Sequence, residues 1–599
     1  FAGSLWLGGR DASGQLKVAA LRFRQVGMDF WTGPLSTVTA EIDPSTCDQW
    51  DIHFKSTRQA VDNFVNPLNS DPTPEFIKTW PAHGDPSKDE AAYLAPFTDV
   101  DGDGFYNYTA GDYPGYDLSG DVDCQGSLLN IYGDENLWWI FNDKGNIHTE
   151  SGGQSIGMEI RAQAFSFATN DEVNNMTFYN YELVNRSSFA LQNTYFGFWV
   201  DPDLGNAQDD YVGCDVERGL GFCFNGDEFD EDNSGRPGYG ENPPAIGVDF
   251  FQGPFQDTDG KDNCLCNTYA DAIADDGIVY DGSGVGYGNG IVDDERLGMR
   301  AFLYHNNDRS VTGDPRVAND YYNFLQSIWT DNSSMYYGGN GHQSGNVVQP
   351  LIEADFMFPD DTDPKGWGTG GNVQSPWTEV TAGNAPADRR FVQSAGPFGL
   401  APGAINNITV GVVWAQANSG GAAASVQAMK QADTKTQALF DNCFQLLDGP
   451  DAPTVSIKEM DQQLVFQLDN VGGNNANDDY FEIDPFIVAP TDSIQDENGD
   501  YVLKSDDPIL FDSLTTEYRS YRFQGYQVYQ LADASVSAAD LYNDDRARLV
   551  FQCDVKDDVA RLINYRFDLD LEAVVPELRV DVAVNDGIYK TFTLSEDFF

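Results

Sequence analysis

The chain has 599 residues and carries 95 Asp and Glu against 34 Lys and Arg, which gives a formal net charge of −61. Such an anionic surface repels phosphate backbones and anionic lipid, so nucleic-acid binding and membrane binding through basic patches are excluded. Apolar residues make up 41% of the chain and aromatic residues 13%, which is enough for large cores and argues against overall disorder. No apolar run approaches the roughly 20 residues that a membrane-spanning helix needs. The small partners that this charge favours are cations.

The apolar residues up to about residue 450 recur mostly with period two, which predicts strands separated by Asn, Asp and Gly turns. The clearest predicted strands span residues 16–24, 158–168, 176–185, 194–200 and 408–417. Three of them follow one another between residues 158 and 200, as in an antiparallel meander. Short helices are predicted at 56–65 and 74–80, the second with Pro74 in its first turn. A large antiparallel β domain with few helices is therefore expected.

The composition changes near residue 450. All 11 tryptophans lie before Ala415, and only five of the 59 glycines lie after Pro450. Residues 422–447 lack Gly and Pro and carry apolar residues at three- and four-residue steps, which predicts a helix packed on a core. The Gly-Pro step that follows ends this helix and starts a linker. We therefore expect two domains, 1–449 and 450–599.

The second domain shows short alternating segments that predict strands, at 453–458, 463–468, 521–530, 547–553 and 578–583. Turn signals separate them, and an acidic insertion lies at about 491–507. This pattern favours a β-sandwich of the immunoglobulin or fibronectin kind. The predicted fold class is mainly β: a large antiparallel domain with long metal-ordered loops and few helices, followed by this sandwich.

The eight cysteines do not indicate a zinc site. None forms a Cys-x-x-Cys pair, and Cys264 and Cys266 have the wrong spacing for a zinc knuckle, with no histidine nearby. Cys214 and Cys223 flank a Gly-rich turn, so they can close a small disulfide loop if the compartment is oxidising. Buried free thiols are the alternative for these two residues.

Three stretches rich in Gly and Asp exceed ordinary loop lengths, namely 99–125, 226–240 and 257–295. The first contains Asp99-Val-Asp-Gly-Asp-Gly, with carboxylates at positions 1, 3 and 5 of a calcium loop and a glycine at position 6 for the sharp turn. Position 12 is Ala110, so Asp112 is the predicted substitute for the usual bidentate ligand. The predicted ligands are carboxylates, one carbonyl and one amide: Asp99, Asp101, Asp103, Phe105, Asn107 and Asp112.

The second stretch contains a more complete loop between residues 230 and 241. Its predicted ligands, at positions 1, 3, 5, 7 and 12, are Asp230, Asp232, Ser234, Arg236 through its carbonyl, and Glu241. Pro237 and the lack of flanking helical patterns make a paired helical EF-hand improbable, so an isolated calcium loop is expected.

Weaker acidic patterns occur at 257–262, at 289–295 and after the strand predicted at 194–200. The last of these is a cluster of four carboxylates, Asp201, Asp203, Asp209 and Asp210. An ordinary solvated turn is the alternative for each pattern, since Asp and Gly are also turn residues. Calcium is favoured over magnesium because flexible loops with several carboxylates suit a high coordination number. Each bound ion would also offset two of the negative charges that repel one another.

No catalytic signature stands out. Only five histidines occur, and no His-Glu-x-x-His pattern is present, which excludes a zinc protease of that type. Residues 153–157 match Gly-x-Ser-x-Gly but lack the strand before and the helix after that a nucleophile elbow needs. Residues 284–290 lack the lysine of a phosphate loop. A glycosidase needs only two carboxylates, and 95 acidic residues neither exclude nor nominate a pair.

Several short aromatic segments are distinctive, among them Asp29-Phe-Trp-Thr-Gly-Pro-Leu and Trp199-Val-Asp-Pro-Asp-Leu-Gly. Further segments lie at 1–9, 112–114, 138–143, 209–218, 250–254, 388–391 and 406–414. They resemble large surface proteins of Bacteroidetes that are exported by the type IX secretion system. The resemblance implies an extracellular or cell-surface location, β-rich modules, a fibronectin-like C-terminal sandwich and no established enzymatic activity. Those proteins normally end in a sorting domain that this chain lacks, so we expect a cleaved chain, an excerpt or part of a larger polypeptide.

The combined interpretation is a non-enzymatic secreted or cell-surface protein with a structural or adhesive role, alone or as a subunit of an extracellular assembly or filament, stabilised by calcium. The expected partners are calcium ions, other copies or surface proteins, glycans and the secretion machinery, without nucleic acid or direct membrane insertion. The alternative is a secreted carbohydrate-active hydrolase or a glycan-binding protein, in which the many aromatic residues would stack on sugars rather than fill cores. A third interpretation is a passive module of a giant adhesin.

Overall fold

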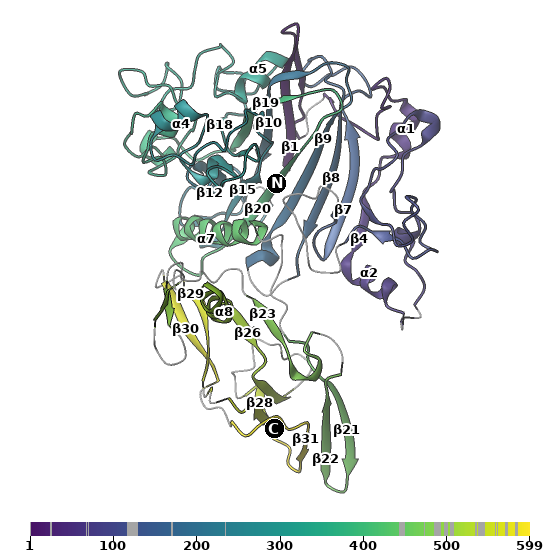
Figure 1. Ribbon diagram of the computed structural model, residues 1–599. Coiled ribbons are helices and arrows are strands. Elements are labelled where there is room, and N and C mark those ends of the chain that lie inside the picture. The colour runs from purple at the N-terminus through teal and green to yellow at the C-terminus, as the bar shows by residue number, and fades with distance from the viewer. Residues whose placement is uncertain are drawn as a thin grey trace. The chain divides into compact units, whose positions relative to one another are not determined.

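The computed structural model in Figure 1 describes residues 2–23, 27–67, 69, 71–116, 130–168, 172–233, 235–441, 450–471, 474–483, 493–495, 501–503, 508–532, 536, 545–557, 559, 561–568, 573–580 and 585–599. Strands account for 35% and helices for 15%, and the large sheets are antiparallel, so the mainly β fold predicted from the sequence is confirmed. The chain divides into two compact units, Phe1–Phe444 and Gln445–Phe599.

Two antiparallel sheets build the first unit. The five-stranded sheet has the order β18 (Ala301–His305), β19 (Arg390–Leu400), β10 (Leu191–Asp201), β1 (Ala2–Asp11) and β2 (Leu16–Ala19). The nine-stranded sheet has the order β11 (Asp210–Asp215), β12 (Leu220–Asn225), β15 (Ala245–Gln252), β20 (Ile405–Ala415), β9 (Thr177–Asn185), β8 (Met158–Ser166), β7 (Glu135–Asn142) and β3 (Trp31–Thr32), with β4 (Phe54–Thr57) also paired to β7. Both sheets pair strands that are far apart in the sequence, so distant loops meet at the strand ends.

The helices of the first unit are short except for one. The short ones are α1 (Pro44–Gln49), α2 (Arg58–Val65), α3 (Glu75–Lys78), α4 (Tyr269–Asp275), α5 (Ala318–Phe324) and α6 (Glu379–Ala382). Helix α7 (Gly421–Asp441) packs against β15 and β20 and stacks Phe440 on Phe251, with ring centroids 6.0 Å apart. It confirms the helix predicted at 422–447 as far as Asp441; residues 442–449 lie outside the described residues. No described helix has the length and apolar character needed to cross a membrane.

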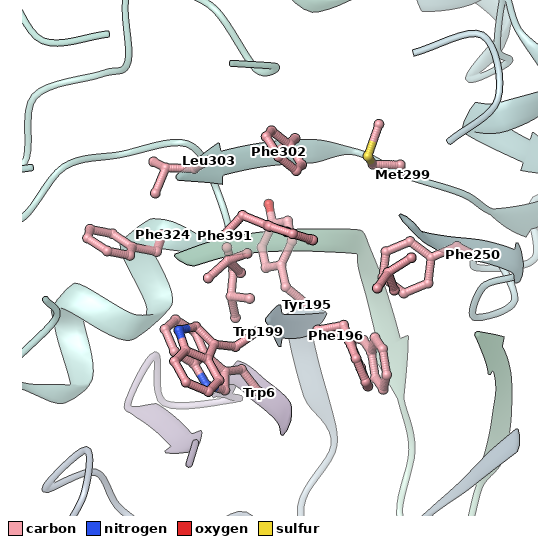
Figure 2. Close-up of a cluster of buried hydrophobic side chains, with 14 of the residues drawn as sticks. Trp6, Tyr195, Phe196, Trp199, Phe250, Met299, Phe302, Leu303, Phe324 and Phe391 are labelled. Carbon is pink, nitrogen blue, oxygen red and sulfur yellow. The ribbon is translucent and has the colours of Figure 1, made fainter. Parts of the chain in front are cut away.

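Aromatic side chains from the five-stranded sheet and from α5 form the centre of the main core (Figure 2). Trp6 on β1 and Trp199 on β10 are fully buried, and Trp6 stands edge-on to Tyr321 with ring centroids 4.8 Å apart. Phe302 on β18 packs on Phe391 of β19 at 5.1 Å. Large buried rings stabilise a core through their area and through these edge and offset contacts. At these positions, Trp6 and Trp199, the tryptophans of the first unit therefore serve core packing.

The predicted meander between residues 158 and 200 is wrong in its third strand. β8 and β9 pair as expected, but β10 leaves them and pairs with β1 and β19 in the other sheet. The neighbour of β9 on that side is β20, which occupies the edge that β10 would need. β10 is buried at nearly every position, which suits a central strand between two partners rather than a half-exposed strand of a meander.

Two further predicted boundaries are wrong for local reasons. The strand predicted at 16–24 is β2, which ends at Ala19, because the Ala20 N–H donates to Asp29 Oδ2 at 3.1 Å instead of to a neighbouring strand. The helix predicted at 56–65 begins only at Arg58, since the residues before it pair with β7 as β4. The strands predicted at 158–168, 176–185, 194–200 and 408–417 are confirmed by β8, β9, β10 and β20, and the helix at 74–80 by α3.

The second unit consists of small antiparallel sheets. Its elements are β21 (Thr454–Met460), β22 (Gln463–Asp469), β23 (Phe481–Ile483), β24 (Ser493–Gln495), β25 (Tyr501–Leu503), α8 (Pro508–Tyr518), β26 (Ser520–Arg522), β27 (Gly525–Leu531), β28 (Ala547–Asp554), β29 (Leu562–Asp568), β30 (Ala573–Val580) and β31 (Thr591–Leu594). β22 pairs with both β21 and β31, so the start and the end of this unit share a sheet. Phe592 stacks between Phe466 and Phe551, at 4.8 and 4.1 Å, in its small core. All five segments predicted as strands contain strand, although 521–530 is divided between β26 and β27, and 578–583 lies within the described residues only to Val580.

Candidate metal centres

The loop from Asp99 to Asp112 is held at its base by a two-stranded ribbon. β5 (Phe97–Thr98) pairs with β6 (Tyr113–Pro114), so the two ends of the loop are fixed side by side. Within the loop, one oxygen each from Asp99, Asp101 and Asp103 lies within 4.8 Å of the other two. The structure therefore brings together the three carboxylates that the spacing predicts as ligands.

Backbone N–H groups shape this loop around the first carboxylate. Asp99 accepts hydrogen bonds from the N–H of Gly102 at 2.8 Å and of Gly104 at 2.7 Å. Both glycines have positive φ, +73° and +81°, a conformation that other residues rarely adopt. The bond from Gly104 holds the pKa of Asp99 below its usual range, whereas desolvation and the adjacent carboxylates raise the pKa of Asp101. The loop thus turns as the glycine at position 6 predicts.

Asp112 has a different place from the one predicted. It is fully buried, and its oxygens accept from the N–H of Val100 at 2.8 Å and of Asn107 at 2.7 Å. Asn107 Oδ1 in turn accepts from the N–H and the hydroxyl of Thr109, at 3.1 and 2.7 Å. Asp112 and Asn107 therefore brace the loop backbone in the structure, and they are not members of the convergent carboxylate group. The Phe105 side chain is 69% exposed, so this residue contributes at most its carbonyl.

The loop from Asp230 to Glu241 is a hairpin closed by β13 (Phe229–Asp230) and β14 (Gly240–Glu241). Its first carboxylate faces inward: Asp230 is 2% exposed and accepts from the N–H of Asn206 at 3.0 Å and of Tyr239 at 2.7 Å. Asp232 Oδ1 accepts from the Gly238 N–H at 3.0 Å.

The other predicted ligands of this hairpin do not join Asp230. The Arg236 carbonyl accepts from the Asn233 N–H at 3.0 Å, and Glu241 is exposed on β14. Ser234 lies outside the described residues. Among the described residues, the structure does not gather these side chains into a group of three convergent carboxylates.

The weak patterns at 257–262 and 289–295 lie against each other. Asp262 accepts from the N–H groups of Gly288 and Gly290, both at 2.8 Å, and Asp293 Oδ1 accepts from the N–H of Asp259 at 2.8 Å. Each half-loop therefore uses carboxylates to fix the backbone of the other. The sequence patterns were separate, and the structure joins them into one acidic loop pair beside β16 (Gly284–Val285) and β17 (Arg296–Leu297).

A third acidic cluster lies where β10 ends and β19 begins. Oxygens of Asp201, Asp203 and Asp388 lie within 4.8 Å of one another. Sequence reasoning missed Asp388, which is far along the chain and reaches the cluster because Val200 of β10 pairs with Phe391 of β19. We call Asp201, Asp203 and Asp388 the strand-end cluster.

Asp209 and Asp210 lie beside the strand-end cluster at the start of β11, not within its convergent group. Asp209 Oδ2 accepts from Asn206 Nδ2 at 2.8 Å, and Asp210 Oδ2 accepts from the Leu204 N–H at 3.2 Å. Burial, reinforced by neighbouring carboxylates, raises the pKa of Asp201 and of Asp209 to about 6 and that of Asp210 to about 9. The region is thus crowded with carboxyl groups in which ionisation without a counter-charge is unfavourable.

A separate pair of buried acids lies where α7 packs against β15. Asp249 on β15 and Asp433 on α7 are 1% and 2% exposed, and burial raises the pKa of both carboxyl groups. Burial and the charge of Asp433 both raise the pKa of Asp249, so the protonated form of this carboxyl group is favoured in the folded chain. Nearby, Asp215 forms ion pairs with Arg218 at 3.0 Å and with Lys430 at 2.9 Å. The buried acids of the first unit therefore include an ion-paired carboxylate, Asp215, as well as carboxyl groups whose pKa burial raises.

Of the two alternatives for Cys214 and Cys223, the structure has the buried free thiols and not the disulfide. Both residues are fully buried free thiols, and Cys214 lies opposite Gly221 rather than opposite Cys223 in the β11–β12 ladder. Burial raises the pKa of both thiols well above their usual range, so they pack as small apolar groups. Cys264 and Cys266 form a disulfide instead, a pairing that the sequence does not predict.

The buried histidines are held in structural contacts. Both ring nitrogens of His148 lie within hydrogen-bond distance of backbone carbonyls, those of Val18 at 2.8 Å and Asp143 at 2.7 Å. His305 Nε2 accepts from the indole N–H of Trp199 at 3.1 Å. The Gly-x-Ser-x-Gly segment at 153–157 is also followed by a strand, β8, and not by the helix that a nucleophile elbow needs. These contacts give His148 and His305 roles in packing.

The sequence matches no protein-family model and no curated protein. The features that bear on its function are therefore its charge, its acidic loops and the geometry of its carboxylates. Of these, the convergence of three carboxylates in the loop from Asp99 is the feature that points most directly to a ligand.

Proposed function

We propose that the chain is a non-enzymatic extracellular or cell-surface protein with a structural or adhesive role, whose acidic loops bind calcium. The observation that carries the proposal is the convergence of Asp99, Asp101 and Asp103 within 4.8 Å on a loop fixed at its base. Hard carboxylate oxygens on a glycine-containing turn are the donors that calcium prefers. A net charge of −61 adds a reason, because bound divalent ions reduce the self-repulsion of the folded chain.

The location and the partners belong to the same proposal. The resemblance of the first 450 residues to type IX cargo proteins of Bacteroidetes supports export, and the Cys264–Cys266 disulfide is compatible with an oxidising compartment. Other copies of the chain, surface proteins or glycans are the proposed partners, within an assembly or filament. For the second unit we propose an immunoglobulin or fibronectin-like sandwich, supported by its short antiparallel strands and by a sheet that joins β21, β22 and β31.

The experiment that tests the proposal measures calcium bound per chain by equilibrium dialysis and elemental analysis. A variant with Asp101→Asn and Asp103→Asn, the loop variant, keeps the size of both side chains but removes two ligand charges, so it is expected to bind one ion fewer than the wild type. The matched control is Asp48→Asn with Asp51→Asn, which removes the same charge from two exposed positions outside the acidic loops. A wild type that binds no calcium, or a loop variant that binds as much as the wild type, contradicts the proposal.

The competing function is a carbohydrate-active hydrolase or glycan-binding protein. Incubating the purified chain with a panel of polysaccharides separates the two. Turnover that is lost when one buried Asp or Glu is changed would replace the proposed function with the competing one. Electron microscopy of the native protein distinguishes isolated particles from repeating polymers.

A further inference from the structure

The strand-end cluster contains buried oxygens that the protein itself leaves without hydrogen-bond partners. Asp201 is 6% exposed, and its Oδ1 accepts no hydrogen bond; Asp388 Oδ1 is also buried and without a partner. Beside the cluster, Asp209 Oδ1 and Asp210 Oδ1 are in the same situation. Buried polar atoms in native proteins are nearly always satisfied, and each exception costs about 1–3 kcal/mol. The two unpartnered oxygens of the strand-end cluster, on Asp201 and Asp388, point to a ligand that meets them.

The protein supplies only part of the charge that this cluster needs. Arg390 Nη2 lies 3.4 Å from Asp201 Oδ2 and 3.3 Å from Asp388 Oδ2. Asn307 Nδ2 donates to Asp388 Oδ2 at 3.3 Å as well. These donors all reach Oδ2 atoms and leave the Oδ1 atoms of both aspartates without a partner. Three carboxylates and one guanidinium leave two negative charges, which is the charge that one divalent cation offsets.

We propose that a divalent cation, calcium by its coordination chemistry, binds between Asp201, Asp203 and Asp388. The donor set consists of carboxylate oxygens alone, and calcium accepts six to eight oxygen ligands in irregular geometry. Zinc is disfavoured because the described cluster offers neither thiolate nor imidazole. The inference rests on the proposed calcium dependence of the chain, but its ligands are different from those of the loop at Asp99.

The position of this site gives the ion a structural task. Asp201 ends β10, Asp203 turns the chain with a φ of +43°, and Asp388 precedes β19. The neighbouring Ala387 N–H donates to the Asp210 carbonyl at 3.1 Å, so the segment before β19 also touches the first strand of the nine-stranded sheet. An ion here ties the end of β10 and the loop that leaves it to the segment before β19, at the point where the chain passes from β10 towards β11.

The test measures bound calcium by equilibrium dialysis against calcium alone. It compares the wild type, the loop variant and a variant with Asp203→Asn and Asp388→Asn, which we call the strand-end variant. Asn has nearly the volume of Asp and tolerates the positive φ at position 203, so the change removes charge with little strain. The strand-end variant is expected to bind one ion fewer than the wild type while retaining the ion of the loop. The control with Asp48→Asn and Asp51→Asn is expected to keep both ions.

The outcomes separate this inference from the proposed function. If the strand-end variant binds as many ions as the wild type, the inference is overturned, and the proposed function stands provided that the loop variant loses its ion. If the wild type binds no calcium, both are overturned. Circular dichroism checks that the variants fold. Should the double variant not fold, Asp203→Asn alone is expected to weaken one site by about tenfold or more, and an unchanged affinity overturns the inference.

Discussion

Removal of calcium by a chelator is expected to lower the melting temperature of the first unit by several degrees or more. An ion that binds the folded but not the unfolded chain stabilises the fold by about 4 kcal/mol when its concentration is about 1,000 times its Kd. Two sites, one in the loop at Asp99 and one at the strand-end cluster, would add their effects because they share no ligand. Chelation also restores the full charge of −61 and its self-repulsion.

Tryptophan fluorescence is a convenient measurement for this melt, because all 11 tryptophans lie before Ala415 and therefore report on the first unit alone. Ionic strength is kept constant between samples, since salt screens surface repulsion by itself. Calcium added back in excess over the chelator is expected to restore the melt fully. The loop variant is expected to lose only part of the response to chelator. Identical melts with and without calcium would count against metal-ordered loops.

The second large effect concerns pH and the pair of Asp249 and Asp433. Burial raises the pKa of Asp249 well above its usual range and that of Asp433 to about 8, against an ordinary value of 3.8. At pH values between the ordinary pKa of 3.8 and the raised pKa, the folded chain therefore holds a proton that the unfolded chain has released. Stability of this kind is present at low pH and is lost as the pH rises through the raised pKa. One such proton makes the wild type about 4 kcal/mol less stable at pH 8 than at pH 5, other groups being equal.

An Asp249→Asn variant isolates this contribution. Asn does not ionise, and its amide N–H is a donor for Asp433, so the variant is expected to lose part of the pH dependence at this site. Urea unfolding at pH 5, 6, 7 and 8 with saturating calcium, followed by tryptophan fluorescence, gives the difference between variant and wild type. We expect that difference to grow in favour of the variant as the pH rises. An exposed control, Asp51→Asn, is expected to parallel the wild type, and a parallel curve for Asp249→Asn would contradict a raised pKa at Asp249.

The parts of the account that sequence predicted depend on short-range patterns. The Asp99-Val-Asp-Gly-Asp-Gly spacing determines its own loop, because the two glycines allow the turn and the carboxylates bond to N–H groups a few residues away. The helix predicted at 422–447, which the structure describes as far as Asp441, follows from a periodicity that one segment carries entirely. The alternating strands of both units are predicted for the same reason.

The parts that sequence did not predict depend on pairings between distant segments. Asp388 joins Asp201 only because β19 pairs with β10, and no local signal near Asp388 indicates that pairing. The position of β10 in the five-stranded sheet likewise depends on its pairing with the distant strands β1 and β19. Asp112 was assigned as a ligand from its spacing, but its burial and its two backbone donors could be known only from the packed loop.

The role of the strands and loops as a metal-ordered scaffold is tested most directly by a crystal structure grown in calcium, with anomalous diffraction used to identify the ion. We expect one anomalous peak about 2.3–2.6 Å from the carboxylate oxygens of Asp99, Asp101 and Asp103, and a second peak at about the same distances from those of Asp201, Asp203 and Asp388. Well-ordered aspartates at both places with no anomalous density between them would contradict it.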